Sequence, residues 1–116
     1  MIKDYKFGSI TIGDHIADQT FNDDVKVAPG LTEKWWRAES HNVAKEDIEK
    51  AVAEKPEFIV IGTGDSGLMN VKENIRDYIE LNNIHLLEMR TTEAIQEYNR
   101  LENQGRRVIG LFHLTC

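Results

Sequence analysis

Apolar and polar residues alternate along the first part of the chain with the two-residue period of half-buried strands. The alternation predicts a strand over Ser9–Ile12, followed by a turn at Gly13-Asp14. It predicts a second strand over Val25–Val27 and a third extended segment over Leu31–Arg37, with the breaker Ala28-Pro29-Gly30 between them. Because these segments are close in sequence, we expect an antiparallel meander.

After His41 the pattern changes to helices that alternate with short apolar runs. Ile48 and Val52 lie four residues apart among charged neighbours, which predicts an amphipathic helix of about three turns ending at Pro56. The apolar run Phe58–Ile61 then predicts the central buried strand.

Two more helix–strand pairs follow. Asn70 and Glu73 resemble a capping box that starts a helix near Val71, and Asn82-Asn83 is a candidate for its left-handed end. The remaining elements are a strand over Ile84–Met89, a helix capped by Thr91 or Thr92 and stopped by Gly105, and a strand over Val108–Leu114. The pattern therefore predicts a single α/β domain over residues 1–116 and leaves its strand order open.

The composition argues against nucleic-acid-binding, membrane-spanning and secreted classes of protein. The chain has 116 residues, 41% of them hydrophobic, and a net charge of -6. A nucleic-acid or anionic-membrane surface needs clustered positive charge, so we expect neither partner. No apolar run approaches the ~20 residues that span a bilayer, and the start of the chain lacks the apolar core of a signal peptide. Because Cys116 is the single cysteine, no internal disulfide can form, and we expect a cytoplasmic protein.

The most informative motif is the glycine-rich loop after the predicted central strand. Gly62, Gly64 and Gly67 match the G-x-G-x-x-G pattern of dinucleotide-binding proteins, and Glu88 stands where an acid would bind ribose. However, the predicted helix starts too late for the glycines to open it, and Asp65 would repel phosphate. We therefore expect no cofactor.

The same loop lacks the lysine of a phosphate-binding P-loop, because Leu68-Met69 stands where lysine and serine or threonine are required. One interpretation is that its glycines serve the tight exit of the strand. The other is that the loop binds a small anion or polar ligand. The residues of that candidate site are Gly62, Thr63, Gly64, Asp65, Ser66 and His113.

The sequence patterns that would indicate a nucleophilic or a metal site are weaker than the glycine-rich motif. His41 and Cys116 could form a catalytic Cys–His pair if His41 folded against the end of the chain. The alternative is that Cys116 packs as a small apolar residue at the end of the last strand. No pair of cysteines or histidines has the spacing of a zinc site on a helix, so we expect no metal.

Trp35 and Trp36 are adjacent in a predicted strand, so their side chains should point to opposite faces. One can join the core. The other then lies over a sheet edge, or it is exposed and anchors an interface with a partner or a second copy.

Three segments, 61–67, 91–101 and 105–116, together resemble one small family. The residues with family-like placement are Tyr98-Asn99, Gly105-Arg106 and His113 through Cys116, and Ser40-His41 and Trp35-Trp36 are also similar. The family includes the adipogenesis-associated domain protein, uncharacterised archaeal and bacterial proteins and, more distantly, the mitochondrial complex I assembly factor 3. The resemblance implies a three-layer fold, with a mixed central sheet between helices and a small amino-terminal antiparallel β-layer. It implies no established enzymatic activity.

Two hypotheses about function follow. The first is a non-catalytic cytoplasmic interaction, assembly or regulatory module that binds a protein partner or itself through Trp35 or Trp36. The second is a small-molecule-binding protein or Cys–His enzyme, with its site at the glycine-rich loop, His41 and the segment from His113 to Cys116.

Overall fold

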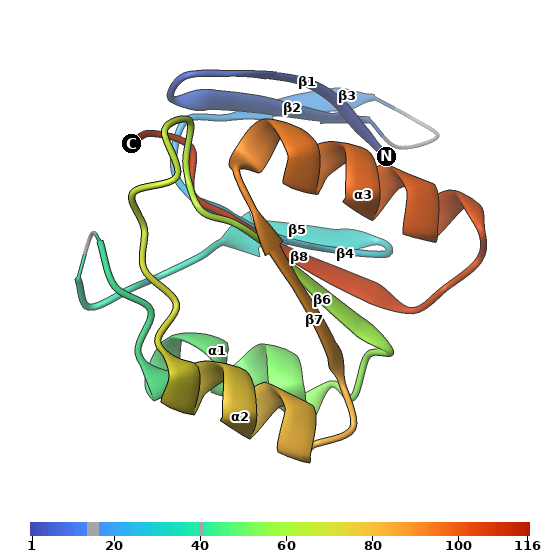
Figure 1. Ribbon diagram of the computed structural model, residues 1–116. Helices are drawn as coiled ribbons and strands as arrows, with labels where there is room; N and C mark the ends of the chain where they lie inside the picture. The colour runs from blue at the N-terminus through green and yellow to red at the C-terminus, as the bar shows by residue number, and fades with distance from the viewer. Residues whose placement is uncertain (14–16, 40) are drawn as a thin grey trace.

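A computed structural model describes residues 1–13, 17–39 and 41–116. It contains a five-stranded sheet, a three-stranded sheet and three helices (Figure 1). Asp14 of the predicted turn and Ser40 of the family resemblance lie outside the described residues.

The five-stranded sheet is mixed and has β8 (Val108–Phe112) in its middle. The strand order is β5 (Leu31–Lys34), β4 (Val25–Ala28), β8, β6 (Phe58–Gly62) and β7 (His85–Met89). β6 runs parallel to both β7 and β8, whereas β4 is antiparallel to β8 and β5. The carboxyl ends of β6, β7 and β8 therefore lie at one edge, next to the start of β4.

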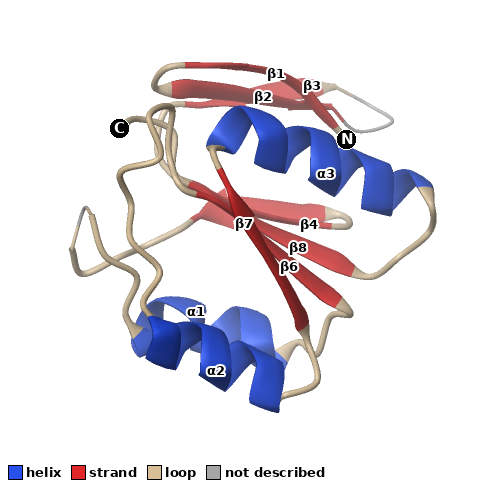
Figure 2. Ribbon diagram, viewed as in Figure 1, coloured by secondary structure: helices blue, strands red, loops and turns tan. Residues whose placement is uncertain are grey.

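Helices cover both faces of this sheet (Figure 2). Helices α1 (Lys45–Ala53) and α2 (Glu73–Leu81) cover one face, and α3 (Thr91–Asn103) covers the other. The small antiparallel sheet lies beyond α3 and is formed by β1 (Ile2–Lys6), β2 (Ser9–Gly13) and β3 (Asp18–Phe21). The expected fold, with a mixed sheet between helices and a small antiparallel layer, is confirmed.

The central strands supply two hydrophobic cores because their side chains alternate between faces. Ile59 and Ile61 of β6 pack with α1 and α2, whereas Val60 packs with α3 and the small sheet. On β8, Gly110 leaves room for an aromatic pair. A Cβ atom at that position would lie 2.4 Å from the Phe112 ring, which contacts the Tyr98 ring edge-on at 5.9 Å.

The amino-terminal strands differ most from prediction. The hairpin of β4 and β5 joins the central sheet instead of the small layer, and its second strand ends at Lys34 instead of Arg37. The small sheet instead uses β1 and β3, which the sequence analysis missed. These strands are edges with few buried side chains, so they lack a strong apolar alternation.

The ends of the helices test the predicted caps. The capping box at Asn70 is wrong, because α2 begins at Glu73 and Asn70 forms a parallel bridge with Asn42. Thr91 is the first residue of α3, not its cap, because its hydroxyl is bound elsewhere. The predicted left-handed end of α2 is confirmed at Asn83, where φ is 61°.

Across the described ranges, none of the helices combines the length and the apolar character that crossing a membrane requires.

Candidate functional site

The candidate residues of the glycine-rich loop and of the chain after β8 lie side by side. The loop leaves the carboxyl end of β6, and residues 113–116 leave the carboxyl end of the parallel strand β8 (Figure 1). The edge where parallel strands end is a common place for binding sites in α/β proteins. We call this region the carboxyl edge.

At the carboxyl edge, oxygens of residues 115 and 116 accept hydrogen bonds from N–H groups of the loop. The Asp65 N–H donates to the Thr115 carbonyl oxygen at 2.6 Å, and the Leu68 N–H donates to the Cys116 oxygen at 2.9 Å. Gly64 has a φ of 109°, and a Cβ atom there would lie 2.4 Å from the Cys116 carbonyl carbon. The glycine therefore serves a close backbone contact, and two donors that an anion would need are already engaged.

Other residues of the loop form hydrogen bonds with the end of β7 and with Arg90, which follows it. Gly62 and Thr63 are buried, and the Thr63 N–H and hydroxyl both donate to the Met89 carbonyl oxygen, at 2.9 Å and 3.1 Å. Ser66 is exposed and Asp65 is half-buried. Arg90 donates twice to the Asp65 carbonyl oxygen, at 2.9 Å and 2.7 Å.

Thr91, at the start of α3, joins the loop to the end of β8. Its fully buried hydroxyl accepts from the Gly64 N–H at 2.9 Å and donates to the His113 carbonyl oxygen at 2.6 Å. Thr91 satisfies the backbone groups that the loop buries. The structure of the loop therefore favours the interpretation that its glycines serve the tight exit of the strand over that of an anion site.

We predict that Thr91→Val, which keeps the side-chain shape, lowers the free energy of unfolding by about 2 kcal/mol, because both backbone groups lose their partner. Urea denaturation measures the effect. Thr11→Val is the control, since the Thr11 hydroxyl contacts the Thr20 hydroxyl at an exposed position. Equal losses in the two variants would contradict the role assigned to Thr91.

A buried charged cluster lies beside this junction. Asp24, which precedes β4, accepts the Leu114 N–H at 2.9 Å through Oδ1 and lies 2.8 Å from His113 Nδ1 through Oδ2. Arg37 pairs with the same carboxylate and lies 2.9 Å from His113 Nδ1. The side chains of Arg37 and His113 are each 6% exposed, so this Asp24–Arg37–His113 cluster is part of the interior.

The cluster shifts the titration of its carboxylate. Burial tends to raise the pKa of Asp24, but hydrogen bonds from His113, Arg37 and the Leu114 N–H outweigh it and lower the pKa. His113 Nδ1 lies within hydrogen-bond distance of the Asp24 carboxylate, an acceptor, and of the Arg37 guanidinium, a donor, so its own role depends on the tautomer. His113 Nε2 is buried and has no hydrogen bond among the residues that the structure describes.

The sequence analysis identified His113 but missed Asp24 and Arg37. No local motif joins them, because the register that places Val25 opposite Phe112 brings Asp24 to His113. The cluster ties the start of β4 and the segment after β5 to the chain after β8.

The two adjacent tryptophans separate as expected, although both lie after β5 instead of within it. Trp35 is 5% exposed, and its ring nitrogen donates to the Asp47 carbonyl oxygen at 2.8 Å. Trp36 is 73% exposed, with the Lys34 ammonium 4.0 Å from its ring centroid. The interface role of these residues stays a prediction.

The proposed Cys–His pair is not assembled in this structure. His41 is exposed and Cys116 is half-buried, and over residues 1–13, 17–39 and 41–116 no hydrogen bond joins Cys116 to His41 or His113. Within the same ranges, no three His, Cys, Asp or Glu side chains gather in a way that could hold a metal ion.

Comparison with known proteins decides the family. The family described as "Protein of unknown function (DUF498/DUF598)" matches residues 2–113. The chain belongs to this family. The match supports the archaeal and bacterial part of the resemblance, whereas the link to the adipogenesis-associated and complex I assembly proteins stays a prediction.

Solved structures share the fold of this DUF498/DUF598 chain over its whole length. A conserved hypothetical protein of Pyrococcus horikoshii OT3, PH1505, is 24% identical, with a TM-score of 0.82 over 100% of this chain and 99% of that one. A protein called MT938 is 28% identical, with a TM-score of 0.79 and coverage of 100% and 98%. An outer membrane protein from Bartonella henselae is 23% identical, with a TM-score of 0.81 and coverage of 99% and 94%.

Proposed function

We propose that this DUF498/DUF598 chain is a protein-interaction module that acts without catalysis, with Trp36 as the anchor of its binding surface. An assembly or regulatory role fits the family resemblance, and the single cysteine fits a reducing compartment such as the cytoplasm. The observation that carries the proposal is an exposed tryptophan held between two buried, tethered residues.

Trp36 lies between two residues that are bound to the body of the protein. On one side, Trp35 is buried and donates through its backbone N–H to the Asp24 carbonyl oxygen at 2.8 Å. On the other side, Arg37 is bound to the Asp24 carboxylate, and its guanidinium lies 5.1 Å from the Trp35 ring centroid. Because the residues on both sides of Trp36 are already held, its backbone needs less ordering on binding, and this favours a tryptophan as an interface anchor.

The surface beside Trp36 offers both apolar and polar contacts. A hollow of about 410 Å³ lies between β5 and α1 and includes both tryptophans. Its charged residues carry both signs, as in the polar rim that surrounds the apolar centre of many protein interfaces. They are Lys26, Glu33, Lys34, Glu46, Asp47 and Lys50.

The alternative, a small-ligand site at the glycine-rich loop, has less support. An anion would have to displace the Thr115 and Cys116 oxygens from the Asp65 and Leu68 N–H groups. The second candidate is therefore a site for a polar ligand that binds other groups of the loop.

We predict that Trp36→Ala weakens partner binding or self-association at least about tenfold, because truncating an anchor tryptophan typically costs about 2 kcal/mol or more. Proteins that copurify with the tagged chain from its native cells are quantified for wild type and variant, and sedimentation velocity measures self-association. Leu81→Ala is the matched control, since Leu81 is an exposed apolar residue on α2. Retention of the same proteins and the same sedimentation by both variants would remove the proposal's main support.

A further inference from the structure

The strand β7 ends the five-stranded sheet, and among the described residues none pairs with the outer side of its backbone. The His85 N–H donates to the Glu57 carbonyl oxygen, and the Met89 carbonyl oxygen accepts from the Thr63 N–H. Because backbone groups alternate in direction along a strand, His85, Leu87 and Met89 face β6. The N–H and C=O groups of Leu86 and Glu88 therefore point away from the sheet.

The other edge strands carry more protective features than β7, whose charged residue is Glu88. The edge of β1 is capped by Asn99, whose side chain accepts from the Ile2 N–H and donates to the Ile2 carbonyl oxygen. β3 is largely polar, and half of the residues of β5 are charged. Charged residues and covered backbone are devices that keep sheet edges from pairing. By contrast, the middle of β7 is the apolar pair Leu86-Leu87.

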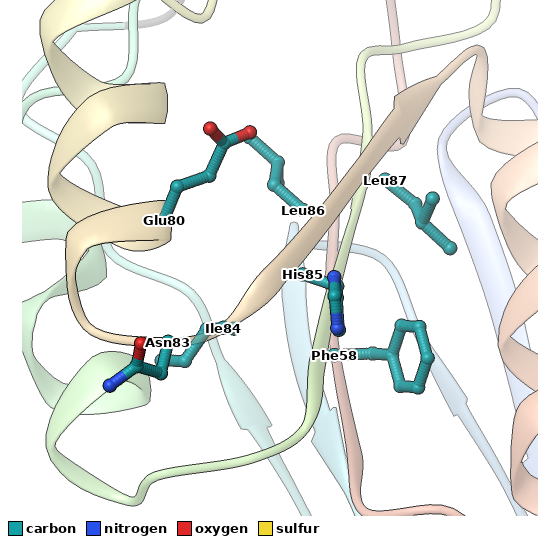
Figure 3. A pocket seen from close by; sticks show the side chains of 7 residues that line it. All are labelled: Phe58, Glu80, Asn83, Ile84, His85, Leu86 and Leu87. Carbon is teal, nitrogen blue, oxygen red and sulfur yellow. The ribbon is translucent and has the colours of Figure 1, made fainter.

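A hollow of about 690 Å³ surrounds this free edge. Its lining residues come from both faces of the sheet, as Figure 3 shows for Glu80 and Leu86 on one side of β7 and Leu87 on the other. Phe58 and His85 extend it on the α3 face, with ring centroids 5.3 Å apart. The hollow thus offers places for the alternating side chains of an added strand, and not only for its backbone.

The hollow has an acidic residue, Glu80, in its lining. Glu80 reaches from α2 toward Leu86, and no salt bridge joins it to a cation in the described parts of the chain (Figure 3). Glu88 is paired with Arg76. A second copy would bring another Glu80 to this edge and is itself acidic overall, with a net charge of -6, whereas a basic segment would complement Glu80.

We propose that the free edge of β7 accepts an extended segment of a partner protein as an added strand, with a lysine or arginine of that segment facing Glu80. This surface is separate from Trp36, because β5 and β7 are opposite edges of the sheet. The proposal adds a second binding surface to the proposed interaction module and specifies its partner as a basic extended segment.

The test uses the full chain and two labelled synthetic peptides that alternate valine with a charged residue, lysine in one and glutamate in the other. Fluorescence anisotropy measures affinity, and amide chemical shifts locate the contact. We predict that the lysine peptide binds at least about tenfold more tightly, since opposite charges favour the pair and like charges oppose it. The largest shift changes are expected at Leu86 and Glu88.

Two substitutions test the geometry. Leu86→Pro removes an outward N–H that β6 does not use, and it should abolish peptide binding. Leu86→Ala keeps that N–H and loses only side-chain contact in the hollow, so it should weaken binding but not abolish it. Glu80→Lys, at an exposed position, should reverse the preference between the peptides. This charge reversal tests the proposed partner even if Leu86→Pro fails to fold.

Equal affinity for the two peptides, shift changes away from β7, or unchanged binding by a folded Leu86→Pro would each overturn the proposal. So would a concentration-dependent dimer joined through β7 without peptide, because the occupant would then be a second copy. Trp36→Ala is expected to leave peptide affinity unchanged, so this surface and the one at Trp36 can fail separately.

Discussion

Gly64→Ala is expected to lower the free energy of unfolding by about 3 kcal/mol, which combines backbone strain with overpacking. The added Cβ atom would lie 2.5 Å from the Cys116 oxygen and 2.8 Å from the Thr115 oxygen, and both neighbours are backbone. The backbone must also hold alanine at a φ of 109°, a region that L residues rarely adopt. Urea denaturation of wild type and variant measures the loss.

Gly30→Ala separates the two causes. Gly30 also has a positive φ, of 80°, but a Cβ atom there would have no neighbour within 4 Å. We expect Gly30→Ala to lose only about 1 kcal/mol, the cost of the left-handed conformation. If the two variants were equally stable, residues 115–116 would not be packed against Gly64 in solution.

The second large effect is expected from Asp24→Asn, which should lower the free energy of unfolding by about 3 kcal/mol. The substitution leaves the buried Arg37 guanidinium without its anionic partner and replaces one acceptor of the carboxylate by an amide donor. Asp18→Asn is the control, because its ion pair with Lys3 is long, at 3.9 Å, and half-exposed. It should change stability by less than about 0.5 kcal/mol.

The same cluster predicts a dependence on pH. The folded-state pKa of Asp24 lies below its ordinary value of 3.8, so its ionisation stabilises the fold above that value. This contribution is lost as the pH falls through the folded-state pKa. Stability measured from about pH 6 to about pH 2 should therefore fall more steeply in wild type than in Asp24→Asn. Parallel pH curves would contradict the assignment.

The predictable parts of the fold are those where a single local requirement, such as burial on both faces or a left-handed backbone, determines the residue types. The strands β6 and β8 are buried on both faces, so they appear as continuous apolar runs. Asn83 and Gly105 end helices in the left-handed region, which few other residues enter readily. Asn70 misled the analysis because its position fits a cap, yet its backbone is committed to residues 41–43.

The site was less predictable because it depends on contacts between distant segments. Asp24 and His113 are brought together by strand register, and nothing around Asp24 distinguishes it from Asp23. The glycines of the loop indicated a demanding backbone path, but the sequence does not show that residues 115–116 lie against Gly64. The exposed position of Trp36 depends on how Trp35 and Arg37 are held.

The placement of β8 has a consequence for synthesis on the ribosome. β8 lies between β4 and β6, yet it is made after the other four strands of this sheet. Until it emerges, the β4–β5 hairpin and the β6–β7 pair have no shared neighbour, and each shows an unpaired edge beside apolar side chains. A nascent chain in this state is exposed to aggregation and to chaperones. Insertion of one five-residue segment then joins the two halves.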